Sequence, residues 1–90
     1  LYYKIICLGE NSNGGGFNYA VIDQYGNFLI PFGRYDVIQE FNGKYAYVSK
    51  NGMRGVVDVT TRKEIVPVKY TSTMAYNRYV RYEYDLNKYF

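Results

Sequence analysis

Two aspartates are the residues of this 90-residue chain that most resemble a catalytic pair. Asp23 and Asp58 lie 35 positions apart, and each follows an apolar pair and precedes a turn. Two carboxylates can share acid, base or nucleophile roles in hydrolysis. The alternative is structural, because an aspartate at the end of a strand accepts hydrogen bonds from the backbone amides of the next turn. Recurrence at matching positions favours the structural interpretation.

Other residues that could do chemistry lack their partners. Histidine is absent, which removes the commonest general base and metal ligand. Cys7 stands among apolar neighbours with no histidine to activate it, so we expect a buried free thiol. The glycine run 14–16 lacks the Lys-Ser/Thr that follows a phosphate-binding loop and is interpreted as a flexible hairpin loop. We expect no enzymatic activity, no metal and no cofactor.

The segments that would hold the two aspartates repeat each other. The repeat begins with an apolar pair and aspartate, continues with a second apolar pair and proline, and ends with tyrosine. In the two copies these are Val21-Ile22-Asp23 and Val56-Val57-Asp58, Leu29-Ile30-Pro31 and Ile65-Val66-Pro67, and Tyr35 and Tyr70. We interpret the aspartates as turn residues, the prolines as strand stops, and the tyrosines as core anchors whose hydroxyls bind backbone. One extra residue between aspartate and proline in the second copy predicts a lengthened turn or a bulge.

Short apolar runs separated by Gly, Asn and Pro are typical of a strand meander, and no segment shows a helical period. Thirteen tyrosines and no tryptophan suit half-buried positions in a sheet. Asn51-Gly52 predicts a two-residue type I′ hairpin that pairs Val48 with Gly55 and Ala46 with Val57. Both faces of this hairpin carry apolar groups, so we expect both to be covered. The final basic, tyrosine-rich run 78–84 is predicted to add an edge strand.

These patterns predict one all-β domain over residues 1–90. We expect an antiparallel meander of about seven or eight short strands from two 35-residue repeats, at about 17–41 and 42–82, forming a sandwich or a partly open barrel. Strand 63–66 should end at Pro67, as strand 28–30 should end at Pro31. A stacked array usually needs three repeats. The domain should therefore close on itself, pair with a second copy, or be excised from a longer chain.

The repeat resembles the bacterial WG-repeat family, also called KWG-repeat. The fullest match is Gly43-Lys44-Tyr45-Ala46-Tyr47-Val48, Lys50-Asn51-Gly52, Gly55-Val56-Val57-Asp58, Ile65-Val66-Pro67 and Tyr70. The resemblance covers about residues 17–82. The family's Trp-Gly appears as Arg54-Gly55 in one copy and Tyr19-Ala20 in the other, so the indole is missing. The resemblance implies a binding or assembly role in a bacterial protein and brings no catalytic residues.

Arginine and tyrosine are interleaved where the two copies differ. That combination is typical of protein-binding surfaces and also of sugar and single-strand nucleic-acid platforms. The candidate binding residues are Arg54, Tyr76, Arg78, Tyr79, Arg81 and Tyr82. The leading hypothesis is a non-catalytic protein-interaction or assembly module. The alternative is a carbohydrate or cell-wall binder that uses tyrosine platforms.

Charge and hydropathy restrict the partners. The net charge is only +3 and the basic residues are scattered, so nucleic acid is not an expected partner. No apolar run is long enough to span a membrane. We expect a protein or glycan partner, or a homodimer through the terminal strand. The chain starts at Leu1, so a leader could have been removed, and a secreted or cell-surface location is favoured over a cytoplasmic one.

Overall fold

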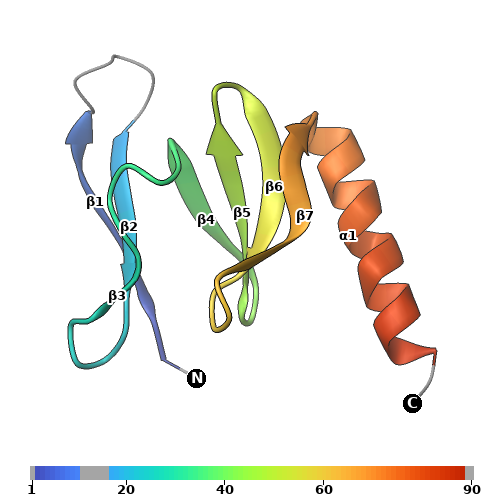
Figure 1. The fold of residues 1–90 in the computed structure, drawn as a ribbon, viewed down its shortest axis with the longest axis horizontal. Helices are drawn as coiled ribbons and strands as arrows, with labels where there is room; N and C mark the ends of the chain where they lie inside the picture. Colours follow the sequence, from blue (N-terminus) through green and yellow to red (C-terminus); the bar gives the residue numbers. More distant parts are fainter. Residues whose placement is uncertain (1, 11–16, 89–90) are drawn as a thin grey trace.

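The computed structural model describes residues 2–10 and 17–88. In this part of the chain, seven strands form two antiparallel sheets and one helix follows them. Sheet 1 contains β1 (Lys4–Glu10), β2 (Phe17–Ile22) and β3 (Phe28–Ile30), and sheet 2 contains β4 (Val37–Asn42), β5 (Tyr45–Lys50), β6 (Met53–Asp58) and β7 (Lys63–Tyr70). The helix α1 spans Ser72–Asn87. Figure 1 shows sheet 1 at one end of the molecule, sheet 2 in the middle and α1 at the other end.

The mostly β antiparallel architecture is confirmed, and strands pair in the order of the sequence. The described strands form two separate sheets and close no barrel. The glycine run 14–16 lies outside the described residues.

The C-terminal helix corrects two predictions, the absence of a helix and the edge strand over 78–84. The Thr71 hydroxyl accepts a hydrogen bond from the Met74 amide at 3.3 Å and caps the first turn. Ala75, Tyr79 and Tyr82 then recur every three or four residues and pack on sheet 2. Tyrosine content suggested a strand, but this spacing places the buried side chains on one helical face.

The β5–β6 hairpin is as predicted. Asn51 and Gly52 have φ values of 53° and 81°, which a type I′ turn requires. Ala46 pairs with Val57, and Val48 pairs with Gly55. Both faces of this hairpin are covered, also as predicted.

The covering elements are sheet 1 on one face of sheet 2 and α1 on the other. The inter-sheet core consists of Val21, Ile30, Tyr35, Ile38, Ala46, Val48, Val57 and Val59. The sheet–helix core consists of Tyr45, Val56, Val66, Ala75 and Tyr79. Val56 and Val57 are adjacent in β6 and so point into different cores. Sheet 2 is therefore buried on both sides.

The two copies of the repeat have the same ladder. Val21 pairs with Ile30 as Val56 pairs with Val66, and the register then shifts before the next pair in each copy. Those next pairs are Ile22 with Phe28 and Val57 with Glu64. The extra residue of the second copy therefore lies in the turn between aspartate and strand, and the lengthened turn is confirmed.

The two prolines differ. Pro31 follows the end of β3, as predicted, but β7 continues past Pro67 to Tyr70, so the predicted end at Val66 is wrong. Pro67 lies where the ladder shifts between Val66 and Tyr70, and at such a bulge an amide hydrogen is not needed. The bulge passes so close to β6 that a Cβ on Gly55 would overlap the Val66 carbonyl oxygen.

Three local predictions also need correction. Cys7 is exposed rather than buried, because β1 is an edge strand and Cys7 forms part of neither core. Tyr35 is a buried core residue, but its hydroxyl donates to Glu64 Oε2 at 2.7 Å and not to backbone. Tyr70 is only half-buried, and cationic side chains lie over its ring.

Candidate functional site

The two aspartates are turn residues that belong to different sheets. Asp23 Oδ1 accepts hydrogen bonds from the amides of Tyr25 and Asn27, both at 2.9 Å. Asp58 Oδ1 accepts from the amide and the hydroxyl of Thr60 at 2.9 and 2.5 Å. Each carboxylate is thus used by its own turn, and the structural interpretation is confirmed.

These hydrogen bonds also set the acidity of both carboxyls. The Asn27 amide contributes most to lowering the pKa of Asp23 below its ordinary value. Burial acts to raise the pKa of Asp58, but the Thr60 hydroxyl, the backbone amides of Thr60 and Thr61 and nearby Lys44 outweigh it, so this pKa is also lowered. Lys44 Nζ lies 3.5 Å from Asp58 Oδ2. Neither carboxyl has the raised pKa that a general acid needs at neutral pH.

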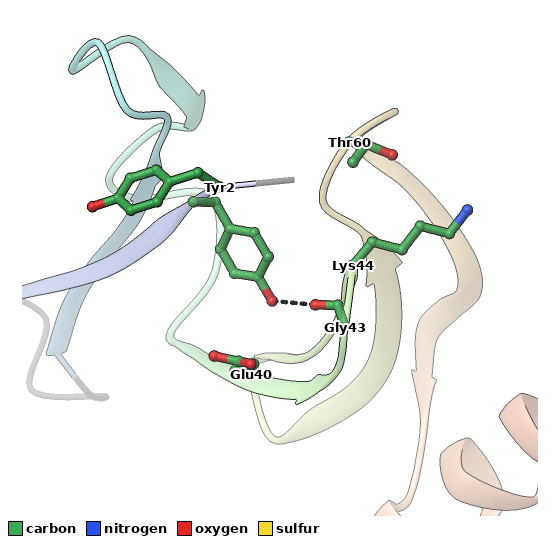
Figure 2. Close-up of a pocket in the computed structure, with 6 residues that line it drawn as sticks. Tyr2, Glu40, Gly43, Lys44 and Thr60 are labelled. Carbon is green, nitrogen blue, oxygen red and sulfur yellow. Dashed lines mark hydrogen bonds between the residues drawn. The ribbon is translucent and has the colours of Figure 1, made fainter.

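A cavity of about 700 Å³ lies between the start of the chain and sheet 2. Figure 2 shows Tyr2, Glu40, Gly43, Lys44 and Thr60 around it. Its polar groups are largely engaged already, because the Tyr3 hydroxyl donates to the Gly43 carbonyl at 2.6 Å and Lys44 pairs with Asp58. We do not place the functional site in this cavity.

The six residues singled out from the sequence are divided between the core and the surface. Tyr79 is only 4% exposed and belongs to the sheet–helix core. Its hydroxyl donates to Glu83 and accepts from Asn42 Nδ2 at 2.8 Å, and burial together with Glu83 raises the pKa of Tyr79 to about 12. Tyr82 is half-buried against the Tyr45 ring. These two tyrosines hold α1 on the sheet.

The other four predicted residues are exposed. Arg54 and Tyr76 line one cavity of about 240 Å³ together with Gln39, Tyr47 and Ser72. Arg78 places its guanidinium 5.0 Å from the centre of the Tyr70 ring. Arg81 forms an ion pair with Asp85 at 3.2 Å and lies over Tyr84 on the side of α1 away from sheet 2. The structure therefore brings Arg54 and Tyr76 together and places Arg81 elsewhere.

An aromatic cluster supports the cavity that Arg54 and Tyr76 line. The Phe41 ring contacts the rings of Tyr47, Tyr76 and Tyr79, at 4.2, 6.4 and 4.6 Å between centroids. The pairs with Tyr76 and Tyr79 are edge-to-face, a geometry that adds to the stabilisation that burial provides. Tyr76 itself remains 50% exposed. The cluster thus presents a positioned tyrosine ring to solvent.

Beside this cavity, cations gather around one tyrosine. We call this the Tyr70 surface, which consists of Arg54, Lys69, Tyr70 and Arg78. Arg54 is the ladder neighbour of Tyr70, and Lys69 Nζ lies 5.6 Å from the ring centre. All three cations are exposed, and within residues 2–10 and 17–88 none forms an ion pair with a carboxylate. This is a patch of uncompensated positive charge on an aromatic base.

Sequence reasoning missed Tyr70 and Lys69 as surface residues. The repeat aligned Tyr70 with Tyr35, and this equivalence suggested a second core anchor. The neighbouring residues gave no signal that separates the two tyrosines, because each follows a basic residue, Arg34 in the first copy and Lys69 in the second. Tyr35 is buried because the chain turns between the sheets there, whereas Tyr70 ends an edge strand.

Neither a metal site nor a membrane-spanning helix is found in the described residues. No three histidine, cysteine, aspartate or glutamate side chains of this part of the chain are grouped so that they could hold a metal ion. The α1 helix is too short and too polar to cross a bilayer, and it is the only helix over residues 2–10 and 17–88.

Comparisons with known proteins identify no relative. No protein-family model matches the chain, no curated protein matches its sequence, and no solved structure matches its fold.

Proposed function

We propose that this domain is a non-catalytic protein-interaction module whose contact surface is the Tyr70 surface and the adjoining Arg54–Tyr76 cavity. The observation that carries the proposal concerns three cations that have no ion-pair partner among the described residues: Lys69 and Arg78 lie over one half-buried tyrosine ring, Tyr70, and Arg54 is the ladder partner of that tyrosine. Arginine and tyrosine are the side chains most enriched among the residues that dominate protein–protein binding energy. The partner should present an acidic segment.

The charge and the rigidity of this surface both favour binding of a protein partner. Free surface cations attract opposite charge and increase the rate of encounter with an acidic partner. Tyr76 and Tyr70 are positioned by the sheet–helix packing, so binding to them immobilises little additional side chain. A planar guanidinium can bind a carboxylate through two parallel hydrogen bonds. Arg54 and Arg78 flank Tyr70 and supply two such groups.

A carbohydrate-binding role is the second candidate. Tyr47 and Tyr76 lie at the small cavity beside Gln39 and Ser72, so rings and neutral polar groups meet there. Tyrosine faces can stack on sugar rings, and amides can bind sugar hydroxyls. Binding of this kind would not depend on the charges of Arg54 and Arg78.

The resemblance to bacterial WG-repeat proteins supports an interaction or assembly role. In that resemblance Arg54 replaces the tryptophan of the motif. A cation therefore occupies the position where the family has an indole, at the centre of the proposed contact surface. We also propose that the protein is bacterial and that it is secreted or located at the cell surface.

The test is a fluorescence-anisotropy titration with a labelled peptide of alternating glutamate and glycine. We expect a dissociation constant on the order of 10–100 µM at low salt, with at least about tenfold weaker binding near 0.5 M salt. The matched probe replaces every glutamate with glutamine and should not bind. Arg78→Gln should weaken binding about fivefold, whereas Arg62→Gln, in the turn before β7, should not.

Two outcomes would contradict the proposal. One is equal binding of the glutamine peptide, and the other is an equal loss of binding with Arg78→Gln and Arg62→Gln. If a xylo- or chito-oligosaccharide shifts the Tyr76 and Tyr47 ring resonances while the acidic peptide does not bind, the carbohydrate role is correct instead.

A further inference from the structure

Sheet 1 has an apolar face on the side away from sheet 2. We call it the outer face of sheet 1, and it consists of Lys4, Ile6, Ala20, Ile22 and Phe28. These residues share a face because Ile6 pairs with Ala20 and Ile22 pairs with both Lys4 and Phe28. Their neighbours Ile5 and Val21 point into the inter-sheet core. Phe28 is 55% exposed, and its ring contacts Phe32 at 5.7 Å.

The internal repeat shows what this kind of face does. Ile22 and Val57 occupy equivalent positions 35 residues apart, and Ile6 is equivalent to Val48, because Ile6 pairs with Ala20 as Val48 pairs with Gly55. In the second copy, Val48 and Val57 are each only 1% exposed, because sheet 1 covers them. In the first copy, Ile6 and Ile22 are half-buried and belong to neither core cluster of the described residues. The face that a sheet covers in the second copy is thus only partly covered in the first, where Ala20 is buried between its neighbours, Ile6 and Ile22 are half-buried and Phe28 is exposed.

The outer face of sheet 1 differs from the equivalent face of sheet 2 at one position that bears on what could cover it. The residue that pairs with Val57 is Glu64, and Glu64 accepts the hydrogen bond of Tyr35 from the covering segment. The equivalent residue in the first copy is Phe28, which pairs with Ile22. A covering unit built like this repeat would lose its tyrosine hydrogen bond at Phe28. A second apolar face would instead pack well there, and the outer face of another copy supplies one.

We propose that the outer face of sheet 1 is a self-association surface on which a second copy of this chain packs, outer face to outer face. Two like faces related by a twofold axis make a closed contact, which is the commonest symmetry of homodimers. Lys4 lies at the edge of the face, where solvent screens its charge. This surface replaces the predicted terminal-strand contact, because residues 78–84 are helical.

The contact is small. The molecule extends 43 × 31 × 15 Å, and sheet 1 forms one end of the longest axis, as Figure 1 shows. A face of this size lies at the low end of specific interfaces. The dimer should accordingly dissociate with a constant on the order of 10–100 µM.

Sedimentation equilibrium tests this proposal on the full chain. Wild type should pass from monomer to dimer as its concentration rises through that range. Phe28→Lys changes an exposed side chain and should keep the protein monomeric throughout, with an unchanged circular dichroism spectrum. Val80→Lys is the matched control, because Val80 is 46% exposed on α1. That variant should dimerise like wild type.

Amide NMR shifts that depend on protein concentration provide a second readout. They should concentrate in β1, β2 and β3 and spare α1. A wild-type monomer at millimolar concentration, a dimer that survives Phe28→Lys, or concentration-dependent shifts confined to α1 would each overturn the proposal. The proposal is independent of the Tyr70 surface. Loss of dimerisation in Phe28→Lys should leave acidic-peptide binding intact, so either proposal can fail alone.

Discussion

The two copies of the repeat share a turn and a ladder but differ in the path of the chain after the proline. In each copy an aspartate accepts hydrogen bonds from the next turn, and a residue with positive φ closes that turn, Gly26 at 84° and Arg62 at 62°. In the first copy the strand stops before Pro31 and the chain crosses to sheet 2. In the second copy the strand runs through Pro67 and leads into α1.

This difference distinguishes the features that neighbouring residues determine from those that tertiary packing determines. Turn chemistry and the register shift depend on residues within a few positions of each other, and they are the same in both copies. The path of the chain after proline depends on which surface is still uncovered. Val21 is buried by sheet 2, whereas its equivalent Val56 is buried by α1. The helix thus covers a face that a sheet covers in the other copy.

The largest expected effect concerns Gly55 and its equivalent Ala20. A Cβ on Gly55 would overlap the Val66 carbonyl oxygen and lie 2.9 Å from the Pro67 carbonyl carbon, so Gly55→Ala must displace β7. We expect a loss of about 2–3 kcal/mol in the free energy of unfolding, measured by urea denaturation. Ala20→Gly, where no proline bulge passes, should cost only about 1 kcal/mol. Equal losses of unfolding free energy in the two variants would show that the β7 bulge does not restrict the side chain at position 55.

The second comparison concerns the aspartates. Asp58 is 5% exposed and has three hydrogen bonds, so Asp58→Ala should cost about 1–3 kcal/mol. Asp23 lies in a more open turn, and Asp23→Ala should cost less. Thermal unfolding at neutral pH measures both. A larger loss for Asp23 would show that burial does not distinguish the two turns.

The same aspartates predict a pH dependence. The pKa of each is lower in the folded state than the ordinary value of 3.8, so the folded state binds the proton more weakly than the unfolded state. Their contribution to stability is therefore present above pH 3.8 and is lost as the pH falls through the lower folded pKa. Asp58→Asn should flatten the acid side of the stability curve. An unchanged acid profile would contradict this account.

The third comparison concerns Tyr35 and Tyr70, which are equivalent in sequence but not in environment. Tyr35→Phe removes the hydrogen bond to Glu64, which joins the two copies, and should cost about 1 kcal/mol. Tyr70→Phe, at an exposed edge, should change the unfolding free energy by less than about 0.5 kcal/mol. Urea denaturation of both variants checks this. Equal effects would indicate that Tyr70 is a core anchor after all.

The smallest expected effect is a stabilisation. Arg62 has a φ of 62°, a region that favours glycine, whereas the equivalent turn already has Gly26. Arg62→Gly should raise the free energy of unfolding by about 0.5 kcal/mol, because relieved strain slightly exceeds the added entropy of the unfolded chain. Lys63→Gly, one residue further on in β7, is the control and should be destabilising. Destabilisation by Arg62→Gly would mean that the arginine side chain stabilises the turn.

Local patterns predicted much of sheet 2. Asn51-Gly52 determined the hairpin and its register, because positive φ at both positions restricts the turn to one type. The aspartate turns were also predicted from neighbouring residues, because each carboxylate accepts hydrogen bonds from the amides that follow it. The strand β4 was not assigned, because Val37–Asn42 mixes apolar and polar residues, although it ends at Asn42-Gly43, the same dipeptide that predicted the β5–β6 turn. It forms a strand because β5 is available to pair with it.

The helix and the site were harder to predict. Tyrosine and arginine in α1 are compatible with strand or helix, and only the spacing of Ala75, Tyr79 and Tyr82 distinguishes them. Because residues 78–84 were predicted to form a strand, Tyr79 was predicted on a binding surface, although it is buried in the sheet–helix core. Arg54 and Arg78 were identified by composition. Arg78 reaches Tyr70 because α1 docks beside β7, and Arg54 pairs with Tyr70 because the register of the β6–β7 ladder shifts at Pro67; no short sequence pattern encodes either arrangement.

The most direct test of the interaction surface compares one double variant with a matched control. In the acidic-peptide titration, Arg54→Gln/Arg78→Gln should raise the dissociation constant at least about tenfold, since two uncompensated charges are removed. Arg62→Gln/Lys63→Gln removes the same charge at the other end of β7 and should bind like wild type. Equal weakening in both double variants would show that only net charge matters, and it would contradict a contact surface around Tyr70.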